Sequence, residues 1–124
     1  MSKTVLGFAA ACLSMGILAA PAWAASPADP TEEIAQALLE QDYVSAEQRI
    51  AALGPEASKD AVMLINLGNA YAGMGRRADA QLAYRAAIAA EPDVELDLAD
   101  GSVGTVREVA TVAIERLGVS YAGR

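Results

Sequence analysis

Histidine is absent from this 124-residue sequence, and cysteine, tryptophan and phenylalanine occur once each. The three single residues, Cys12, Trp23 and Phe8, all lie within residues 1–24. Beyond residue 24 no disulfide, thiol or histidine chemistry is available. A serine nucleophile would therefore lack the histidine that usually acts as its general base. These absences predict that the chain is not an enzyme.

Basic residues are also scarce, because nine Lys and Arg stand against sixteen Asp and Glu, which gives a net charge of −7. Nucleic-acid phosphates repel an acidic chain, so we expect no nucleic acid as a partner. Neutral or basic partners are favoured instead.

Residues 1–24 have the pattern of a secretory signal peptide. Lys3 is the only charge before Asp29, Val5 to Ala20 is an almost unbroken apolar run, and Ala22-Trp23-Ala24 provides a small-x-small exit. The run is shorter than the roughly 20 residues that span a bilayer comfortably. We expect cleavage after Ala24, a periplasmic or secreted mature chain, and no stable membrane insertion after cleavage. The alternatives are a retained membrane anchor and a lipoprotein modified at Cys12.

Helical spacing of apolar residues follows a short linker over residues 25–30, where two prolines disfavour a helix. Thr31 is the expected N-cap of the first helix, and either Ser58 or Asp60 opens the third. Gly54-Pro55 is the expected stop of the second. The first, second and fourth predicted helices cover about residues 32–41, 44–53 and 78–90, and the third ends near residues 73–75.

The apolar period changes from helical to alternating after residue 93. Val94, Leu96 and Leu98 alternate with Glu95, Asp97 and Ala99, which predicts a short extended strand before a turn at Asp100-Gly101. A last helix is predicted over residues 106–117. Thr105 and Glu108 have the spacing of a capping box, and Gly118 is the expected stop.

Residues 61–94 place small, aromatic and turn residues at fixed spacings: Leu64, Leu67, Gly68, Tyr71, Gly75, Ala80, Tyr84, Ala87 and Pro92. This spacing resembles the tetratricopeptide repeat, a helical hairpin with a 34-residue period. Small residues at two positions let the helices cross closely, and two tyrosines fill the space beside that crossing. The resemblance is partial over residues 27–60, where Ala46, Ile50 and Leu53 follow the second-helix pattern, and absent after Val94.

This resemblance implies an all-α fold over residues 31–124. It would contain two antiparallel helical hairpins, one short extended segment over residues 94–98, and a C-terminal helix that caps the array. Terminal helices of this kind are expected because a lone hairpin cannot bury its apolar face. The extended segment would cover the end of the array, or pair with a second copy in a homodimer.

A binding groove is also implied, because the first helix of each such repeat lines a concave face. Asn66 and Asn69 would offer hydrogen bonds to the backbone of an extended peptide, or would lie on a solvated helix face. Matching positions carry no Lys or Arg, which argues against recognition of a peptide carboxylate. The expected groove residues are Val62, Ile65, Asn66, Asn69 and Gly73.

Two charged clusters have alternative interpretations. Arg76, Arg77 and Arg85 would form a local basic spot, unless Asp79 and neighbouring acids neutralise them. The acids from Asp93 to Asp100 alternate as in a calcium loop, but glycine and glutamate are missing where an EF-hand needs them. We expect a strand with a solvated acidic face there, and neither a metal nor a cofactor.

The sequence therefore predicts a non-catalytic protein–protein interaction module of the cell envelope, an adaptor or scaffold that binds a peptide or protein along its concave face. The alternatives are a self-associating structural protein and an accessory factor to an envelope enzyme complex. Scaffolds of this kind serve unrelated functions, so the partner is not named by the pattern.

Overall fold

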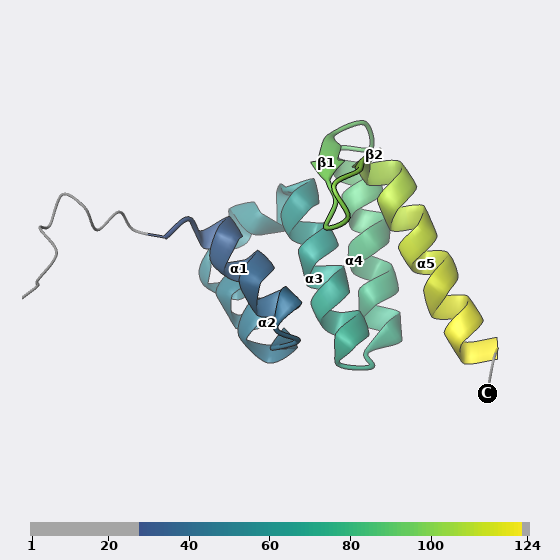
Figure 1. Ribbon diagram of the computed structural model, residues 1–124, viewed down its shortest axis with the longest axis horizontal. Helices are drawn as coiled ribbons and strands as arrows, with labels where there is room; N and C mark the ends of the chain where they lie inside the picture. The colour runs from purple at the N-terminus through teal and green to yellow at the C-terminus, as the bar shows by residue number, and fades with distance from the viewer. Residues whose placement is uncertain (1–27, 123–124) are drawn as a thin grey trace, which may run out of the picture.

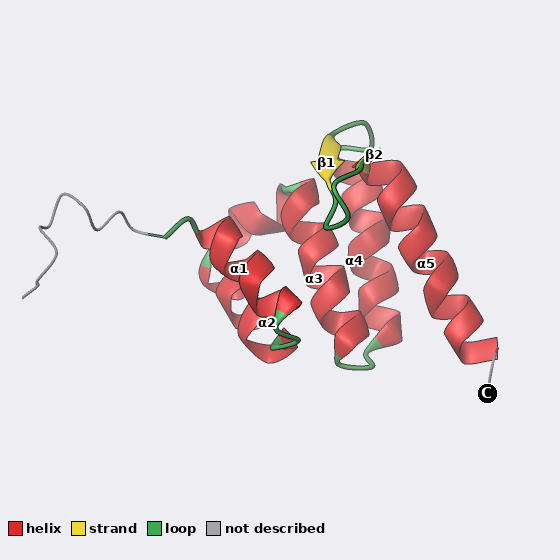
Figure 2. Ribbon diagram, in the orientation of Figure 1, coloured by secondary structure: helices red, strands yellow, loops and turns green. Residues whose placement is uncertain are grey.

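The computed structural model describes residues 28–122, apart from the side chains of residues 119–122. The predicted signal peptide and all but the end of the predicted linker lie outside this range. Figure 2 shows that helix dominates the described part, with one small sheet. The elements are α1 (Pro30–Leu39), α2 (Tyr43–Ala52), the 3₁₀ turn η3 (Pro55–Lys59), α3 (Ala61–Gly73), α4 (Arg77–Ala90), β1 (Glu95–Asp97), β2 (Val103–Thr105) and α5 (Val106–Ala122).

The helices follow one another across the molecule from α1 to α5 (Figure 1). Short turns join α1 to α2 and α3 to α4, so each pair forms a helical hairpin. Helix α3 contacts α1, α2, α4 and α5, which makes it the central element. Its thirteen residues include six buried ones, and no other helix in the described range has as many.

The core consists of small and aliphatic side chains on the facing sides of these helices. The main cluster joins α3, α4 and α5 through Leu64, Ile65, Tyr84, Val106 and Ala110, together with smaller alanines. Two satellite clusters join α1 and α2 to α3. Alanine side chains make many of the contacts between helices, so the helices pack closely. At such contacts even one added heavy atom disturbs the packing.

Both helical hairpins close with the same hydrogen bonds, at positions 34 residues apart in the sequence. After α1, the Asp42 amide donates to Ala37 O at 2.8 Å; after α3, the Arg76 amide donates to Tyr71 O at 2.8 Å. The residue before each donor has a positive φ, 63° at Gln41 and 77° at Gly75. This is the Schellman geometry, which satisfies the last carbonyls of a helix.

Three predicted helix boundaries are wrong by a few residues. Helix α1 begins at Pro30 because Asp29, not Thr31, caps it and accepts from the Thr31 amide at 2.8 Å. Proline suits this first helical position, because a backbone N–H there would have no hydrogen-bond partner within the helix. Helix α1 also ends at Leu39, before the left-handed Gln41. Helix α5 continues through Gly118 to Ala122.

Two boundary predictions are confirmed. Asp60, one of the two expected caps, accepts hydrogen bonds from the amides of Val62 and Met63 and opens α3. The capping box at the start of α5 is present, because Thr105 N donates to Glu108 Oε2 at 2.8 Å and Glu108 N donates to Thr105 Oγ1 at 3.2 Å.

The segment between α4 and α5 is a β-hairpin within the chain. The predicted strand over residues 94–98 is present as β1, and β2 is an addition that alternation alone did not predict. The strands are antiparallel, with Glu95 opposite Thr105, Leu96 opposite Gly104 and Asp97 opposite Val103. Leu96 packs on the main core, which holds the hairpin against the helices.

Candidate binding groove

A groove of about 750 Å³ lies between α1, α3 and the β-hairpin, with Tyr84 of α4 and Val109 of α5 completing it. We call it the first groove. All five residues predicted to line a groove contribute to it: Val62, Ile65, Asn66, Asn69 and Gly73. The structure therefore brings the whole predicted set to one surface.

These five residues differ in how far they reach the surface. Ile65 is only 5% exposed and belongs to the core beneath the groove, whereas Val62 and Asn66 are half-buried. Asn69 and Gly73 are exposed, but a Cβ added to Gly73 would lie 2.4 Å from the Tyr43 ring. Gly73 therefore lets Tyr43 of α2 close one end of the groove.

The crossing of α3 and α4 beneath the groove is as tight as the sequence predicts. A Cβ on Gly68 would lie 2.4 Å from Cε1 of Tyr84, and Ala80 is fully buried. Tyr84 Oη donates to Asn69 Oδ1 at 2.7 Å, and burial raises the pKa of the Tyr84 hydroxyl to about 12. Asn69 thus already has one internal partner, whereas the Asn66 amide has no hydrogen bond to any described side chain.

The remaining residues of the predicted repeat pattern lie in the hairpin of α3 and α4 or directly after it. Leu64 and Ala87 are buried in the main core, and Tyr71 packs against it. Leu67 and Pro92 are half-buried, and Gly75 forms the left-handed turn after α3. In the segment where the sequence resemblance is partial, Ala46 and Ile50 are buried, but Leu53 lies beyond α2 and is 39% exposed.

A second groove of about 780 Å³ lies between the β-hairpin and α5. The sequence did not predict it, because Val112 and Arg116 of α5 meet Leu98 and Val103 only when the hairpin folds back. The two grooves share Asn69, Ala72, Tyr84, Leu98, Ala99 and Val109. The two grooves therefore adjoin, and we call their joint lining the concave surface. In Figure 1 the loop after β1 passes in front of α3.

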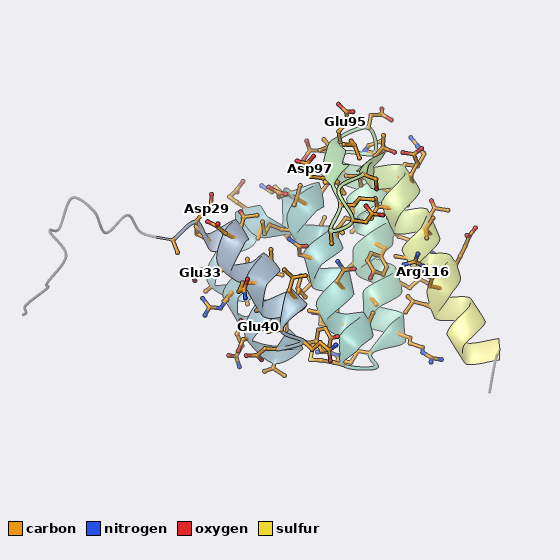
Figure 3. The ribbon with its side chains drawn as sticks, viewed as in Figure 1. Asp29, Glu33, Glu40, Glu95, Asp97 and Arg116 are labelled. Carbon is orange, nitrogen blue, oxygen red and sulfur yellow. The ribbon has the colours of Figure 1, made fainter. Side chains whose placement is uncertain are left out.

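Acids are more frequent than bases around this concave surface. Asp97 lines the first groove; Asp100, Glu108 and Arg116 line the second. Figure 3 shows Glu95 and Asp97 at the hairpin and Arg116 on α5. Hydrogen bonds from Ser102 lower the pKa of Asp100, and hydrogen bonds from Thr105 lower the pKa of Glu108, so both carboxylates are charged at neutral pH.

The predicted basic spot is largely neutralised at Arg76. Arg76 Nε lies 2.9 Å from Asp79 Oδ2, its Nη1 lies 3.7 Å from Glu47 Oε1, and its guanidinium stacks 4.4 Å from the Tyr71 ring centre. Arg76 does not line the first groove. Salt bridging with Asp79 was the alternative interpretation of this cluster.

Residues 28–122 contain no group of three or more His, Cys, Asp and Glu side chains placed to hold a metal ion. No helix within the same range combines the length and the apolar character needed to cross a membrane.

The chain matches no protein-family model, no curated protein and no solved structure. Its function is therefore inferred from the groove and from the sequence pattern alone.

Proposed function

We propose that this protein is a non-catalytic interaction module of the tetratricopeptide type, which binds a peptide or protein segment on its concave surface. The observation that carries the proposal is the first groove, where all five predicted lining residues meet between α1, α3 and the hairpin. Its half-buried and exposed apolar residues include Leu38, Leu39 and Val62. Apolar grooves between helices and near-by sheet edges are common sites for peptide recognition.

The proposed repeat architecture is supported by the two helical hairpins. Their closing turns share both hydrogen bonds and a left-handed residue, at positions one repeat period apart. Ala46 and Ala80, separated by the same period, are both fully buried. Such a period is characteristic of this helical repeat.

Binding without catalysis fits the chemistry of the groove. The polar side chains that line it are the amides of Asn66 and Asn69, the hydroxyls of Tyr43 and Tyr84, and the carboxylate of Asp97. Amides hydrogen-bond in both directions but do not transfer protons near neutral pH. The pKa of Tyr84 lies far above neutrality, which suits packing better than acid–base chemistry. The signal-like pattern of residues 1–24 supports a place for the module in the cell envelope or outside the cell.

The proposal is tested by crosslinking the tagged full-length protein in its own host and comparing two matched variants. Leu39→Arg places a charge in the first groove, and Leu82→Arg places the same charge on α4, outside both grooves. The two leucines are 69% and 66% exposed, so neither change disturbs the core. We expect crosslinks to an exported protein that Leu39→Arg abolishes and Leu82→Arg preserves.

Equal crosslinking by the two variants would contradict binding on the concave surface. Crosslinks only between copies, with a mass that rises with concentration, would favour the self-associating alternative. Asn69→Ala is a poor test, because it would remove the acceptor of the buried Tyr84 hydroxyl and so destabilise the fold. Asn66→Ala leaves that bond intact and is the better amide substitution.

A further inference from the structure

The backbone of β1 has one edge that β2 does not use. Val106 N donates to Val94 O at 2.8 Å, and Leu98 N donates to Ser102 O at 2.8 Å. In an antiparallel ladder these pairs alternate with pairs whose amides and carbonyls point outward. The outward pairs here are Glu95 with Thr105 and Asp97 with Val103. The N–H and C=O groups of Glu95 and Asp97 therefore form the free edge of β1.

This free edge borders the first groove. Leu96, Asp97 and Leu98 all line that groove, opposite Leu38 and Leu39 of α1. In Figure 1, β1 lies on the α1 side of β2, so its outer edge is turned toward α1. Within the described part of the chain, no turn or loop hydrogen bond involves the backbone of Glu95 or Asp97. The groove thus has an apolar floor and one wall made of unpaired backbone groups.

The side chains along this edge are acidic and lack partners among the described residues. Glu95 and Asp97 are both exposed, and neither forms an ion pair with any residue of that range. Leu96 between them turns inward onto the main core. An incoming strand would place residues opposite Glu95 and Asp97 on the solvent face, and the residue between them on the groove face.

We propose that an extended peptide segment with a basic–apolar–basic pattern pairs with β1 as a third, antiparallel strand. This inference rests on the proposed function and specifies the partner and its mode of binding. Lys or Arg at the outer positions would face Glu95 and Asp97, and the apolar residue between them would point toward the groove floor near Val62. Main-chain hydrogen bonds would supply affinity and the alternating side chains specificity, as in other cases of strand addition.

Charge disfavours two other occupants of the same edge. A second copy paired antiparallel through β1 would set Glu95 opposite Asp97 twice, and like charges directly opposite are destabilising. The chain's own N-terminal segment, residues 1–28, contains only one basic residue, Lys3. Neither occupant offers the alternating cations that this edge favours.

Backbone methylation of a synthetic peptide gives the direct test. The probe is blocked, fluorescently labelled Lys-Val-Lys-Val-Lys, whose binding to the purified protein is followed by anisotropy. In the proposed pairing the lysine amides point at β1 and the valine amides point away. N-methylation of the lysines should raise the Kd roughly tenfold or more, because two main-chain hydrogen bonds are lost. N-methylation of the valines should have little effect.

Charge reversal in the protein gives the matching test. The double variant Glu95→Lys with Asp97→Lys should no longer bind the Lys-Val-Lys-Val-Lys peptide. It should instead bind the corresponding peptide with glutamate in place of each lysine. The control is Glu91→Lys with Glu115→Lys, which changes the net charge equally at two exposed positions outside both grooves. Its Kd should stay within about threefold of the parent, because distant surface charges are screened.

The outcomes separate this inference from the proposed function. Equal weakening by both kinds of N-methylation would overturn strand pairing. Absence of peptide binding, in a protein whose crosslinked partner is still lost on Leu39→Arg, would overturn this inference and leave the proposed function standing. A Leu39→Arg variant that keeps its crosslinks would contradict the proposed function itself.

Discussion

Gly68 is the residue on which the packing of the central hairpin depends most directly. A side chain there would enter the Tyr84 ring, since the added Cβ would lie within 3 Å of three ring carbons. The ring cannot move away easily, because Tyr84 is 2% exposed and its hydroxyl is bonded to Asn69. The glycine at this position of the predicted repeat pattern therefore has a steric cause in this chain.

The substitution Gly68→Ala should destabilise the fold by about 1–3 kcal/mol, the usual range for overpacking a filled core. Gly118→Ala is the matched control, because Gly118 is also helical but has no atom within 4 Å of an added Cβ. It should stabilise the protein by up to about 1 kcal/mol through helix propensity. Urea unfolding followed by circular dichroism measures both. Equal effects at the two sites would contradict the close approach of Tyr84 to α3.

At the scale of elements, the two hairpin turns are the same structure made from different residues. Gln41 adopts φ 63° where Gly75 adopts φ 77°. The left-handed conformation costs a residue with a Cβ roughly 1–2 kcal/mol, whereas glycine adopts it freely. The turn after α1 is thus the weaker of the two.

Exchanging the residue types should shift stability in opposite directions. Gln41→Gly should raise the free energy of unfolding by about 0.5–1 kcal/mol, since relief of the strained φ outweighs the added freedom of the unfolded chain. Gly75→Ala should lower it by about 1 kcal/mol, although nothing lies within 4 Å of the new Cβ. Thermal unfolding of both variants and of the parent protein shows whether each substitution raises or lowers stability. A destabilised Gln41→Gly variant would contradict the turn geometry.

Local signals predicted the helices well because apolar residues recur at helical spacing, and side-chain caps begin α1, α2, α3 and α5, although α4 has none. Asp60 caps α3, and Thr105 and Glu108 form the capping box of α5, as their positions in the sequence predict. The errors arise where two local signals compete: proline can break a helix or begin one, and Pro30 begins α1 because Asp29 precedes it. Gly118 is likewise tolerated within α5, whose surface is open at that point.

The groove was predictable only in part. Its α3 side follows from positions in a helix and could be assigned from the repeat pattern. Its other wall depends on Leu96 and Leu98 folding back over α3, a long-range contact that apolar alternation does not specify. The strand β2 escaped prediction because Val103-Gly104-Thr105 has neither the length nor the alternation of a typical strand.

For the whole molecule, the dominant electrostatic feature is an excess of acids. Three of these acids accept hydrogen bonds at junctions between elements. Asp42 caps α2 and accepts from the Ser45 amide; Asp100 accepts from Ser102 in the hairpin loop; Glu108 belongs to the capping box of α5. The hydrogen bonds that each carboxylate accepts lower its pKa below the ordinary value of 3.8 for the aspartates and 4.5 for Glu108. In the folded state, these hydrogen bonds therefore stabilise the charged form of all three carboxylates.

Acid should therefore destabilise the whole fold. Because the folded pKa values are the lower ones, the unfolded chain binds protons first, and the stabilisation is complete only above the unfolded pKa values. It should decline as the pH falls from about 5 through 3, even though protonation also relieves the repulsion between the sixteen acids. The urea midpoint measured across this range should fall steadily. The triple variant Asp42→Asn, Asp100→Asn and Glu108→Gln should begin with a lower midpoint and show a flatter dependence. A midpoint that rises on acidification in the parent would mean that relief of repulsion outweighs the three junction carboxylates.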